Sequence, residues 1–278
     1  MRYKLIAFDL DGTFLDDGKN IPEKNLAALA AAAERGVQLV PATGRIMAGI
    51  PEQIRALPFI RYYITINGAY VCDTLRDRAL YRGEIPLERA LEMLRYMETL
   101  PVLYDCYQDN MGWMSGSMLD RAPEYFRAEP GMLELVRRLR VRVDSLPEYL
   151  RAKGEPVQKL QMYFRRDDMD ERARQLRLLP ALFPELAATT SVSNNIEINS
   201  VTAGKDRGLA ALCGELGIDL RNTAAFGDGS NDLKMISAAG LGVAMANGDE
   251  RLKAAAGLIA PDNNAAGVGE TIMRLLEQ

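Results

Sequence analysis

The sequence predicts an α/β protein in which a mostly parallel, Rossmann-like sheet is interrupted by an inserted α+β domain. Short apolar runs alternate with helical segments over the first eighty residues, and the same alternation returns near the C-terminus. The stretch between them is richer in arginine and in separated β-like pieces. With 278 residues, 48% hydrophobic and 26% charged, the chain is large enough for two domains. We assign residues 1–82 and 193–278 to the core and 83–192 to the insertion.

The N-terminal segment predicts a β-α-β-α-β order. The apolar run Leu5–Phe8, which ends at Asp9, indicates a buried strand. The alanine-rich segment Pro22–Arg35 indicates a helix, with proline at its start and Gly36 after it. The remaining expected elements are a strand at Val37–Val40, a helix at Ile46–Leu57 and a strand at Tyr62–Ile66. Strands joined through helices are parallel, so these strands predict a mostly parallel sheet.

The C-terminal segment repeats this alternation. Expected helices cover 205–216, 231–239, 250–256 and 267–276, and expected strands cover 223–226, 241–245 and 258–260. In the insertion, the clearest strand-like runs are Val102–Gln108 and Lys159–Phe164. The segment Tyr104–Trp113 is predicted to form core and turn, with substrate contact as the alternative. The basic run Arg137–Arg142 is predicted to be a solvated face of one element, with attraction of an anionic substrate as the alternative.

Composition excludes several kinds of protein. The chain has no histidine, so a Ser-His-Asp triad, a Cys-His pair and a histidine-ligated zinc site are excluded. The net charge of −4 argues against a protein that coats nucleic acid or anionic lipid, and the apolar runs are too short to cross a bilayer. The widely spaced Cys72, Cys106 and Cys213 predict free thiols in a reducing compartment. Two acids directly after the first apolar run do not fit a secretory signal, so we expect a cytoplasmic protein.

Two acidic residues follow the first expected strand. Asp9 and Asp11 are two positions apart, so on an extended chain they project to the same side. Two carboxylates about 6–7 Å apart repel by roughly 2–3 kcal/mol at an effective dielectric constant of about 20, which indicates a cation nearby. Ligands also bind at this end of strands in open α/β sheets. The alternative is a plain Asp-Gly-Thr turn in which Asp11 is only a capping residue.

A second acidic cluster, Gly227-Asp228-Gly229-Ser230-Asn231-Asp232, follows the expected strand 223–226. Glycines on both sides of Asp228 allow the backbone to approach a ligand, whereas Asn231 has the alternative role of a helix cap. Hard oxygen ligands at the ends of two parallel strands predict a Mg²⁺ site. The acids that would form it are Asp9, Asp11, Asp228 and Asp232.

Two further segments are expected at the same edge of the sheet. Thr43-Gly44-Arg45 ends the second strand and offers a hydroxyl and backbone N–H groups to an anion. Lys205, near a helix start, offers a cation to phosphate oxygens, with simple solvation as the alternative. A nucleophilic carboxylate, a metal site, a hydroxyl and a cation together predict phosphoryl transfer through an aspartyl phosphate.

Four segments in this order, FDLDGTFLD, ATGR, GKDRGLAAL and FGDGSNDLKMI, resemble the four motifs of the haloacid dehalogenase (HAD) type phosphatases. Almost no insertion separates Asp11 from Thr43, whereas more than a hundred residues separate Thr43 from Lys205. This spacing resembles the Cof-type sugar phosphatases, which carry a type-2 (C2B) cap at that position. The resemblance implies a HAD-like core, a cap that determines specificity, and Mg²⁺-dependent hydrolysis of a small phosphorylated metabolite.

The resemblance also implies a role for each matched residue. Asp9 would be the nucleophile and a Mg²⁺ ligand, and Asp11 would be the general acid and base, with its main-chain carbonyl on the metal. Asp228 would complete the protein ligands, with support from Asp232. The residues that would bind the phosphoryl group or approach the substrate are Gly12, Thr43, Gly44, Lys205, Asn231 and, in the segment Ile-Asn-Gly, Asn67.

Two other functions use the same acids. A phosphomutase of this fold also needs Asp9 and Asp11, and a hexose bisphosphate requirement would identify it. A non-enzymatic, phospho-accepting signalling module is disfavoured, because receiver domains are shorter and carry the acceptor on a later strand. Sugar phosphates are the leading substrates, with nucleotides, pyridoxal phosphate and flavin mononucleotide as alternatives. The sequence contains no signal for an oligomeric state.

Overall fold

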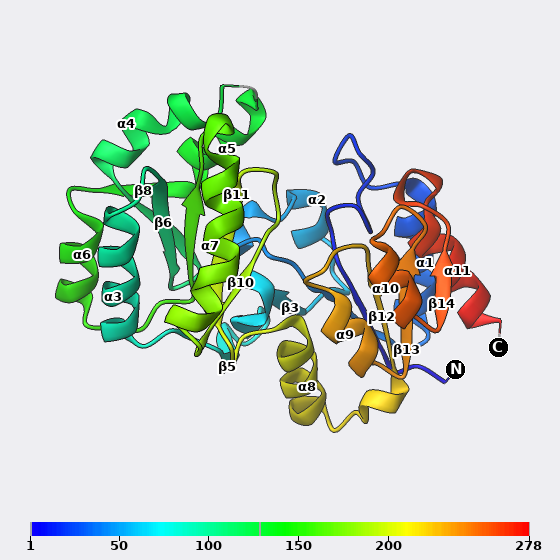
Figure 1. Ribbon diagram of the computed structural model, residues 1–278. Helices are drawn as coiled ribbons and strands as arrows, with labels where there is room; N and C mark the ends of the chain where they lie inside the picture. The colour runs from blue at the N-terminus through cyan, green and yellow to red at the C-terminus, as the bar shows by residue number, and fades with distance from the viewer. Residues whose placement is uncertain (1, 128, 278) are drawn as a thin grey trace. The chain divides into compact units, whose positions relative to one another are not determined.

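The computed structural model describes residues 2–127 and 129–277, which form two compact units (Figure 1). The core unit contains the chain up to Gly44, Pro51–Arg82 and the chain from Ala203 onward, and the inserted unit contains Arg45–Ile50 and Gly83–Thr202. Residues 193–202 therefore lie in the inserted unit, whereas the sequence analysis assigned them to the core. The reason is that strand β11 (Asn195–Ser200) pairs with two strands of the inserted sheet.

The core unit is built on a five-stranded sheet in which every pairing is parallel, in the order β14-β13-β12-β1-β2. The strands are β1 (Leu5–Phe8), β2 (Gln38–Pro41), β12 (Thr223–Gly227), β13 (Leu241–Met245) and β14 (Leu258–Ala260). All residues of β1 are buried, as expected for a central parallel strand that is covered on both faces. The predicted α/β fold with a mostly parallel sheet is confirmed.

Helices cover both faces of this sheet. They are α1 (Glu23–Glu34), α8 (Lys205–Leu216), α9 (Leu233–Ala238), α10 (Glu250–Ala255) and α11 (Gly267–Leu276), with the 3-10 turns η4 (Leu220–Asn222) and η5 (Asn263–Ala265). On one face Leu5 packs with Leu209 of α8 and Met235 of α9. Figure 1 shows α1 and α11 side by side, and Gly269 N of α11 donates to Asn25 Oδ1 of α1 at 2.7 Å. The helices and strands expected after residue 203 are all present, with small shifts at their ends.

The expected helix over 46–57 is interrupted in the structure. It consists of a 3-10 turn, η1 (Met47–Gly49), and a single helical turn, α2 (Glu52–Arg55). Between them Pro51 has no N–H to donate, and it holds Ile50 in an extended conformation with φ −76° and ψ 132°. The prediction of one continuous helix was therefore wrong, because a proline at this position prevents the two turns from joining.

The third expected strand, Tyr62–Ile66, is present as a strand but belongs to a different sheet from the one predicted. A separate three-stranded antiparallel sheet contains β3 (Tyr62–Thr65), β4 (Tyr70–Asp73) and β5 (Arg78–Arg82). One isolated bridge, between Ala42 and Ile64, joins β3 to the end of β2. The chain reverses in the turn η2 (Ile66–Gly68), where Asn67 (φ 55°) and Gly68 (φ 86°) have left-handed backbone. The strand therefore continues into a hairpin, not into the parallel sheet.

The inserted unit is an α+β domain with a six-stranded sheet in the order β10-β11-β9-β6-β7-β8, antiparallel except between β7 and β8. Its other strands are β6 (Leu103–Gln108), β7 (Met111–Ser115), β8 (Arg140–Val143), β9 (Lys159–Tyr163) and β10 (Leu186–Thr189). Its helices are α3 (Leu87–Glu98), α4 (Gly116–Tyr125), α5 (Pro130–Leu139), α6 (Leu146–Lys153) and α7 (Met169–Leu182), with the 3-10 turn η3 (Arg166–Asp168). Helices α3, α6 and α7 contribute Leu94, Leu150 and Leu179 to one core of this unit. Helices α4 and α5 contribute Ala122 and Val136 to another.

The inserted sheet carries a buried polar face. Asp105, Gln161 and Glu197 stand beside one another on β6, β9 and β11, and all are buried. Arg140 Nε donates to Asp105 Oδ2 at 2.6 Å, and Lys159 Nζ donates to Glu197 Oε1 at 2.9 Å. Burying charges in this way costs desolvation energy that apolar side chains would avoid. Each of these buried charges is therefore held beside a partner of opposite charge.

Arg137, Arg138 and Arg142 of the basic run are exposed as predicted, but the prediction was wrong for Arg140, which is buried, and for the assignment of the run to one element. Helix α5 ends at Leu139 and strand β8 begins at Arg140, so the run spans two elements. The Arg140 side chain is 4% exposed, because it pairs with Asp105 and also donates to Tyr107 Oη at 2.9 Å. The segment Tyr104–Trp113 forms core and a turn, as expected. Over the residues that the structure describes, each helix is too short or too polar for a membrane crossing.

Candidate active site

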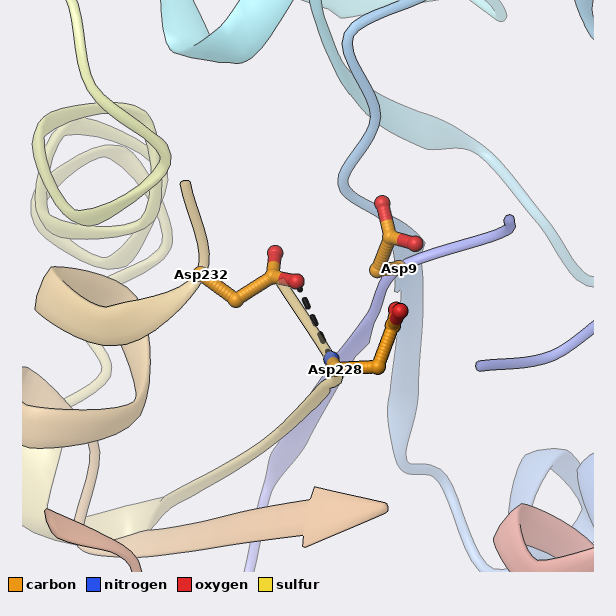
Figure 2. Close-up of side chains that lie close together, drawn as sticks. All are labelled: Asp9, Asp228 and Asp232. Atoms are coloured by element: carbon orange, nitrogen blue, oxygen red, sulfur yellow. Dashed lines mark hydrogen bonds between the residues drawn. The ribbon is translucent and has the colours of Figure 1, made fainter. Parts of the chain in front are cut away.

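The carboxyl ends of β1 and β12 bring three acids together. These strands are neighbours, with Phe8 opposite Phe226, so the residues that follow them meet at one edge of the sheet. Asp9 follows β1, and Asp228 and Asp232 follow β12. One carboxylate oxygen from each of the three lies within 4.8 Å of the others, and Figure 2 shows the three side chains converging. The predicted grouping of Asp9, Asp228 and Asp232 is therefore present in the structure.

The turn after β12 is held closed by Asp232. Its Oδ2 accepts hydrogen bonds from Asp228 N and from Gly229 N, both at 3.1 Å, and the first of these is drawn in Figure 2. Gly12 lies against this turn with φ 79°, and a Cβ there would lie 2.4 Å from Asp228 Oδ2. Only glycine fits this position. The sequence analysis expected Gly12 to lie close to the phosphoryl group. In the structure, its lack of a side chain allows the two acidic turns to lie close to each other.

Lys205 lies within the acid cluster. Its Nζ donates to Asp9 Oδ1 at 2.5 Å and to Asp232 Oδ1 at 2.6 Å, and the residue is 1% exposed. Lys205 is the first residue of α8, whose position depends on Gly68. A Cβ on Gly68 would lie 2.0 Å from Gly204 O, so glycine allows the turn η2 to pack directly on the helix start. The alternative of a merely solvated lysine is excluded.

The electrostatics of the cluster favour a bound dication. Burial raises the pKa of Asp9 well above its usual range; Lys205 opposes this rise, and the nearby carboxylates of Asp232 and Asp228 add to it. Burial lowers the pKa of Lys205, but Asp232 and Asp9 more than compensate and leave it raised. Burial raises the pKa of Asp228 to about 6, against the hydrogen bond from Thr13. When all three acids are ionised, one ammonium leaves two negative charges uncompensated. Hard oxygen donors with this charge fit Mg²⁺.

The other predicted phosphate-binding residues form a second group in the core unit. Thr43 is buried, and its carbonyl accepts a hydrogen bond from Asn67 N at 3.0 Å. Asn67 Oδ1 accepts from Asn231 Nδ2 at 3.3 Å. A Cβ on Gly44 would lie 2.8 Å from Asn67 Oδ1. The structure therefore brings Thr43, Gly44 and Asn231 together around Asn67.

The sequence pattern of the haloacid dehalogenase-like hydrolases matches residues 6–272. The chain belongs to this family. It is 28% identical to the phosphatase YwpJ of Bacillus subtilis, over 98% of this chain and 100% of that one. It is 30% identical to the 5-amino-6-(5-phospho-D-ribitylamino)uracil phosphatase YcsE of the same organism, over 97% of this chain and 94% of that one. Among solved structures it shares the fold of the HAD subclass IIB sugar phosphatase BT4131, with a TM-score of 0.78, 24% identity and 98% coverage of both chains.

These similarities confirm the resemblance on which the sequence analysis relied. This HAD-like hydrolase is an enzyme of the phosphatase class, as its relatives are. A non-enzymatic signalling module is therefore set aside. Along the chain, the inserted α+β unit occupies the segment in which the sequence analysis expected a cap.

In this HAD-like hydrolase the Asp11 side chain is not part of the three-acid group. Its Oδ1 accepts a hydrogen bond from Lys19 Nζ at 2.8 Å, and the Asp11 side chain is 40% exposed. The resemblance implies a metal contact only through the main-chain carbonyl of Asp11, so the position of its side chain does not bear on that expectation. A carboxylate exposed in this way can exchange protons with solvent or with a bound ligand.

Sequence reasoning did not identify three residues that support the site. Thr13 Oγ1 donates to Asp228 Oδ1 at 2.7 Å, and its place in Asp-Gly-Thr was a signal that was interpreted only as turn chemistry. Asn247 Nδ2 donates to Gly12 O at 2.8 Å. Lys19 pairs with Asp11. For Asn247 and Lys19 no spacing in the sequence gave a signal, because both contacts depend on the path of a loop.

Proposed function

We propose that this enzyme is a Mg²⁺-dependent phosphatase that hydrolyses small phosphorylated metabolites, sugar phosphates first, through an aspartyl phosphate on Asp9. The observation that carries the proposal is the Asp9 carboxylate, buried beside Lys205 at 2.5 Å and grouped with Asp228 and Asp232. A buried carboxylate with a fixed cation beside it is equipped to approach a phosphate dianion, whose charge would otherwise repel it.

The reaction has two steps, in which Asp9 and Asp11 have different tasks. In the first, an Asp9 carboxylate oxygen forms a bond to phosphorus, the bond from phosphorus to the leaving oxygen breaks, and Asp11 gives that oxygen a proton. In the second, water attacks the same phosphorus, Asp11 takes a proton from it, and the Asp9 carboxylate is released. Lys205 offsets charge on the phosphoryl oxygens in both steps. Mg²⁺ held by Asp9, Asp228 and the Asp11 carbonyl would add positive charge at the phosphoryl group.

A panel of phosphorylated metabolites tests this proposal. Phosphate release should require Mg²⁺, stop in excess EDTA and return when Mg²⁺ is restored. Sugar phosphates, nucleotides, pyridoxal phosphate and flavin mononucleotide should be included. Transfer to a second hexose phosphate, with a requirement for a hexose bisphosphate, would instead identify a phosphomutase. Indifference to EDTA would contradict the metal-dependent chemistry.

Metal binding should depend on pH through the raised pKa values of the acids. The pKa of Asp228 is about 6 and that of Asp9 is also raised, so a proton competes with the cation below about pH 6. We expect the dissociation constant of Mg²⁺ for the metal-free protein to rise at least about tenfold per pH unit below that point. Isothermal titration calorimetry measures this directly. The Asp228→Asn variant should bind Mg²⁺ weakly at every pH, and a flat affinity in the unmodified protein down to about pH 4.5 would contradict the assignment.

We further propose that the inserted unit determines which metabolite is accepted. Its buried polar face offers Lys159, Glu197 and Gln161, side chains that can bind hydroxyl and phosphate groups. In Lys159→Gln we expect the ratio of kcat/KM values between panel members to change at least about tenfold. The kcat/KM value for p-nitrophenyl phosphate, which lacks a polyhydroxy group, should change by less than about threefold. Lys153→Gln, on an exposed lysine of the same unit, is the matched control. If these ratios are unchanged in a folded Lys159→Gln protein, this face does not determine which metabolite the enzyme accepts.

The three cysteines support an intracellular, reducing environment as part of the same proposal. Cys72, Cys106 and Cys213 are all free and buried. Burial raises the pKa of the Cys72 thiol to about 12 and that of Cys213 to about 11, so both remain unreactive thiols at neutral pH. We therefore place the enzyme in the cytoplasm, with a small phosphorylated metabolite as its partner.

A further inference from the structure

The loop that follows β13, residues 246–249, lies against the second acidic turn, residues 228–232. Asp249 N donates to Asp228 O at 2.9 Å. Gly248 packs on the same residue, since a Cβ at this position would lie 3.0 Å from Asp228 O. Asp249 also begins α10 as its N-cap, so the far end of the loop is held by a helix. Main-chain contacts therefore keep this loop and the second acidic turn together.

The side chain of Asn247, in the same loop, contacts the first acidic turn, residues 9–13. Its Nδ2 donates to Gly12 O at 2.8 Å, and its Oδ1 accepts from Asn263 N at 3.2 Å. A main-chain N–H can only donate and a main-chain carbonyl can only accept, so the two partners together fix the orientation of the amide. The Asn247 amide therefore forms a bridge from the loop to the first acidic turn.

Other asparagines hold the chain just after the first acidic turn, but they connect it to different elements. Asn25 Nδ2 donates to Phe14 O at 2.8 Å, and Asn263 Nδ2 donates to Leu15 O at 3.0 Å. Asn25 belongs to α1 and Asn263 to η5, and neither element carries the second acidic turn. The bridge of Asn247 differs from these bonds because its loop is itself bonded to the second acidic turn.

The two acidic turns repel each other when their acids are ionised. Asp9 lies in the first turn and Asp228 and Asp232 lie in the second, with one oxygen of each within 4.8 Å of the others, and Lys205 supplies one positive charge against them. Like charges this close favour separation of the turns. The hydrogen bond from Thr13 Oγ1 to Asp228 Oδ1, at 2.7 Å, opposes the separation but occupies a carboxylate oxygen. The bridge from the loop opposes it through a main-chain carbonyl.

We propose that Asn247 is a positioning residue, which holds the two acidic turns at the spacing that a divalent cation needs before the cation binds. The inference rests on the proposed function, which assigns Mg²⁺ to these acids. Ligands that are already in place bind a cation more tightly than ligands that must first be brought together, because less order is lost on binding. Without the bridge every acid is still present, but the first turn is free to move away from the second. The affinity for Mg²⁺ should therefore fall although no acid is lost.

Asn247→Ala removes the bridge and leaves the bond from Asp249 N to Asp228 O in place. Isothermal titration calorimetry of the metal-free protein should show the dissociation constant of Mg²⁺ rising about fivefold, the size expected for the loss of one hydrogen bond. At saturating Mg²⁺, kcat should stay within about twofold, because the turns then share a bound cation. Asn264→Ala is the matched control, since Asn264 is another exposed asparagine of the core unit and donates to Asp17 Oδ2 at 3.1 Å. It should leave the dissociation constant unchanged.

A double-mutant cycle with Thr13→Val completes the test. Both contacts hold the same two turns, so Asn247→Ala should raise the dissociation constant in the Thr13→Val background by at least the factor seen in the unmodified protein. A dissociation constant that Asn247→Ala leaves unchanged in both backgrounds would overturn the inference and leave the phosphatase proposal in place. An unmodified protein that binds no Mg²⁺ and releases no phosphate would instead overturn the proposed function itself.

Discussion

Asp9→Asn is expected to lower turnover at least about 10⁴-fold on every substrate while the protein stays folded. An amide oxygen is too weak a nucleophile to form the bond to phosphorus, and no second carboxylate is placed to replace it, since Asp228 and Asp232 are needed around the cation. The substitution keeps the shape of the side chain and an oxygen that can accept from Lys205, which also retains its contact with Asp232 at 2.6 Å. Because burial raises the pKa of Asp9, removing its charge should not lower the free energy of unfolding.

The measurement is phosphate release together with the mass of the acid-quenched protein. The unmodified protein should carry one phosphoryl group during turnover, and Asp9→Asn should carry none. Asp73→Asn is the matched control, because Asp73 is a buried aspartate of the core unit that pairs with Arg61 and lies in β4. It should retain turnover. Residual activity above about one per cent in Asp9→Asn would rule out Asp9 as the nucleophile.

The parts of the site that could be predicted from sequence are those set by neighbouring residues. Leu5–Phe8 is apolar enough to be a buried strand, and Asp9 follows it directly, so the edge of the sheet is specified by a few consecutive positions. The turn around Asp228 has its glycines and acids within one hexapeptide. Parallel strands place such turns at a common edge whatever the length of chain between them. The grouping of Asp9 with Asp228 was therefore predictable across more than two hundred residues.

The parts that could not be predicted depend on contacts between distant residues or on loop backbone. Arg140 is buried because Asp105, far away in the sequence, is there to neutralise it, so a run of arginines appeared solvated. The contact between Lys19 and Asp11 depends on a left-handed residue in a loop, which has no periodic signal. Pro51 is a different case, because it was present in the sequence as a helix-breaking residue and should have divided the predicted helix.

Lys205→Met is expected to remove activity and also to destabilise the protein. The ammonium is buried between Asp9 and Asp232, and its loss leaves two adjacent carboxylates without a compensating charge. Breaking a buried ion pair costs about 3–5 kcal/mol, so the free energy of unfolding at neutral pH should fall by about that amount in EDTA. Turnover should fall at least about 10³-fold, because the phosphoryl oxygens lose their fixed cation. Lys253→Met should change neither quantity.

The pH dependence of this destabilisation identifies its cause. Without Lys205 the positive charge that opposes the rise in the pKa of Asp9 is gone, so the ionised form becomes still less favourable in the folded protein. Lowering the pH lets the buried carboxylate take up a proton, which removes the repulsion. The difference in free energy of unfolding between Lys205→Met and the unmodified protein should therefore narrow as the pH falls from about 7 to about 5. Chemical denaturation in EDTA at each pH measures it. A difference that stays constant over this range would mean that Lys205 contributes packing and not charge.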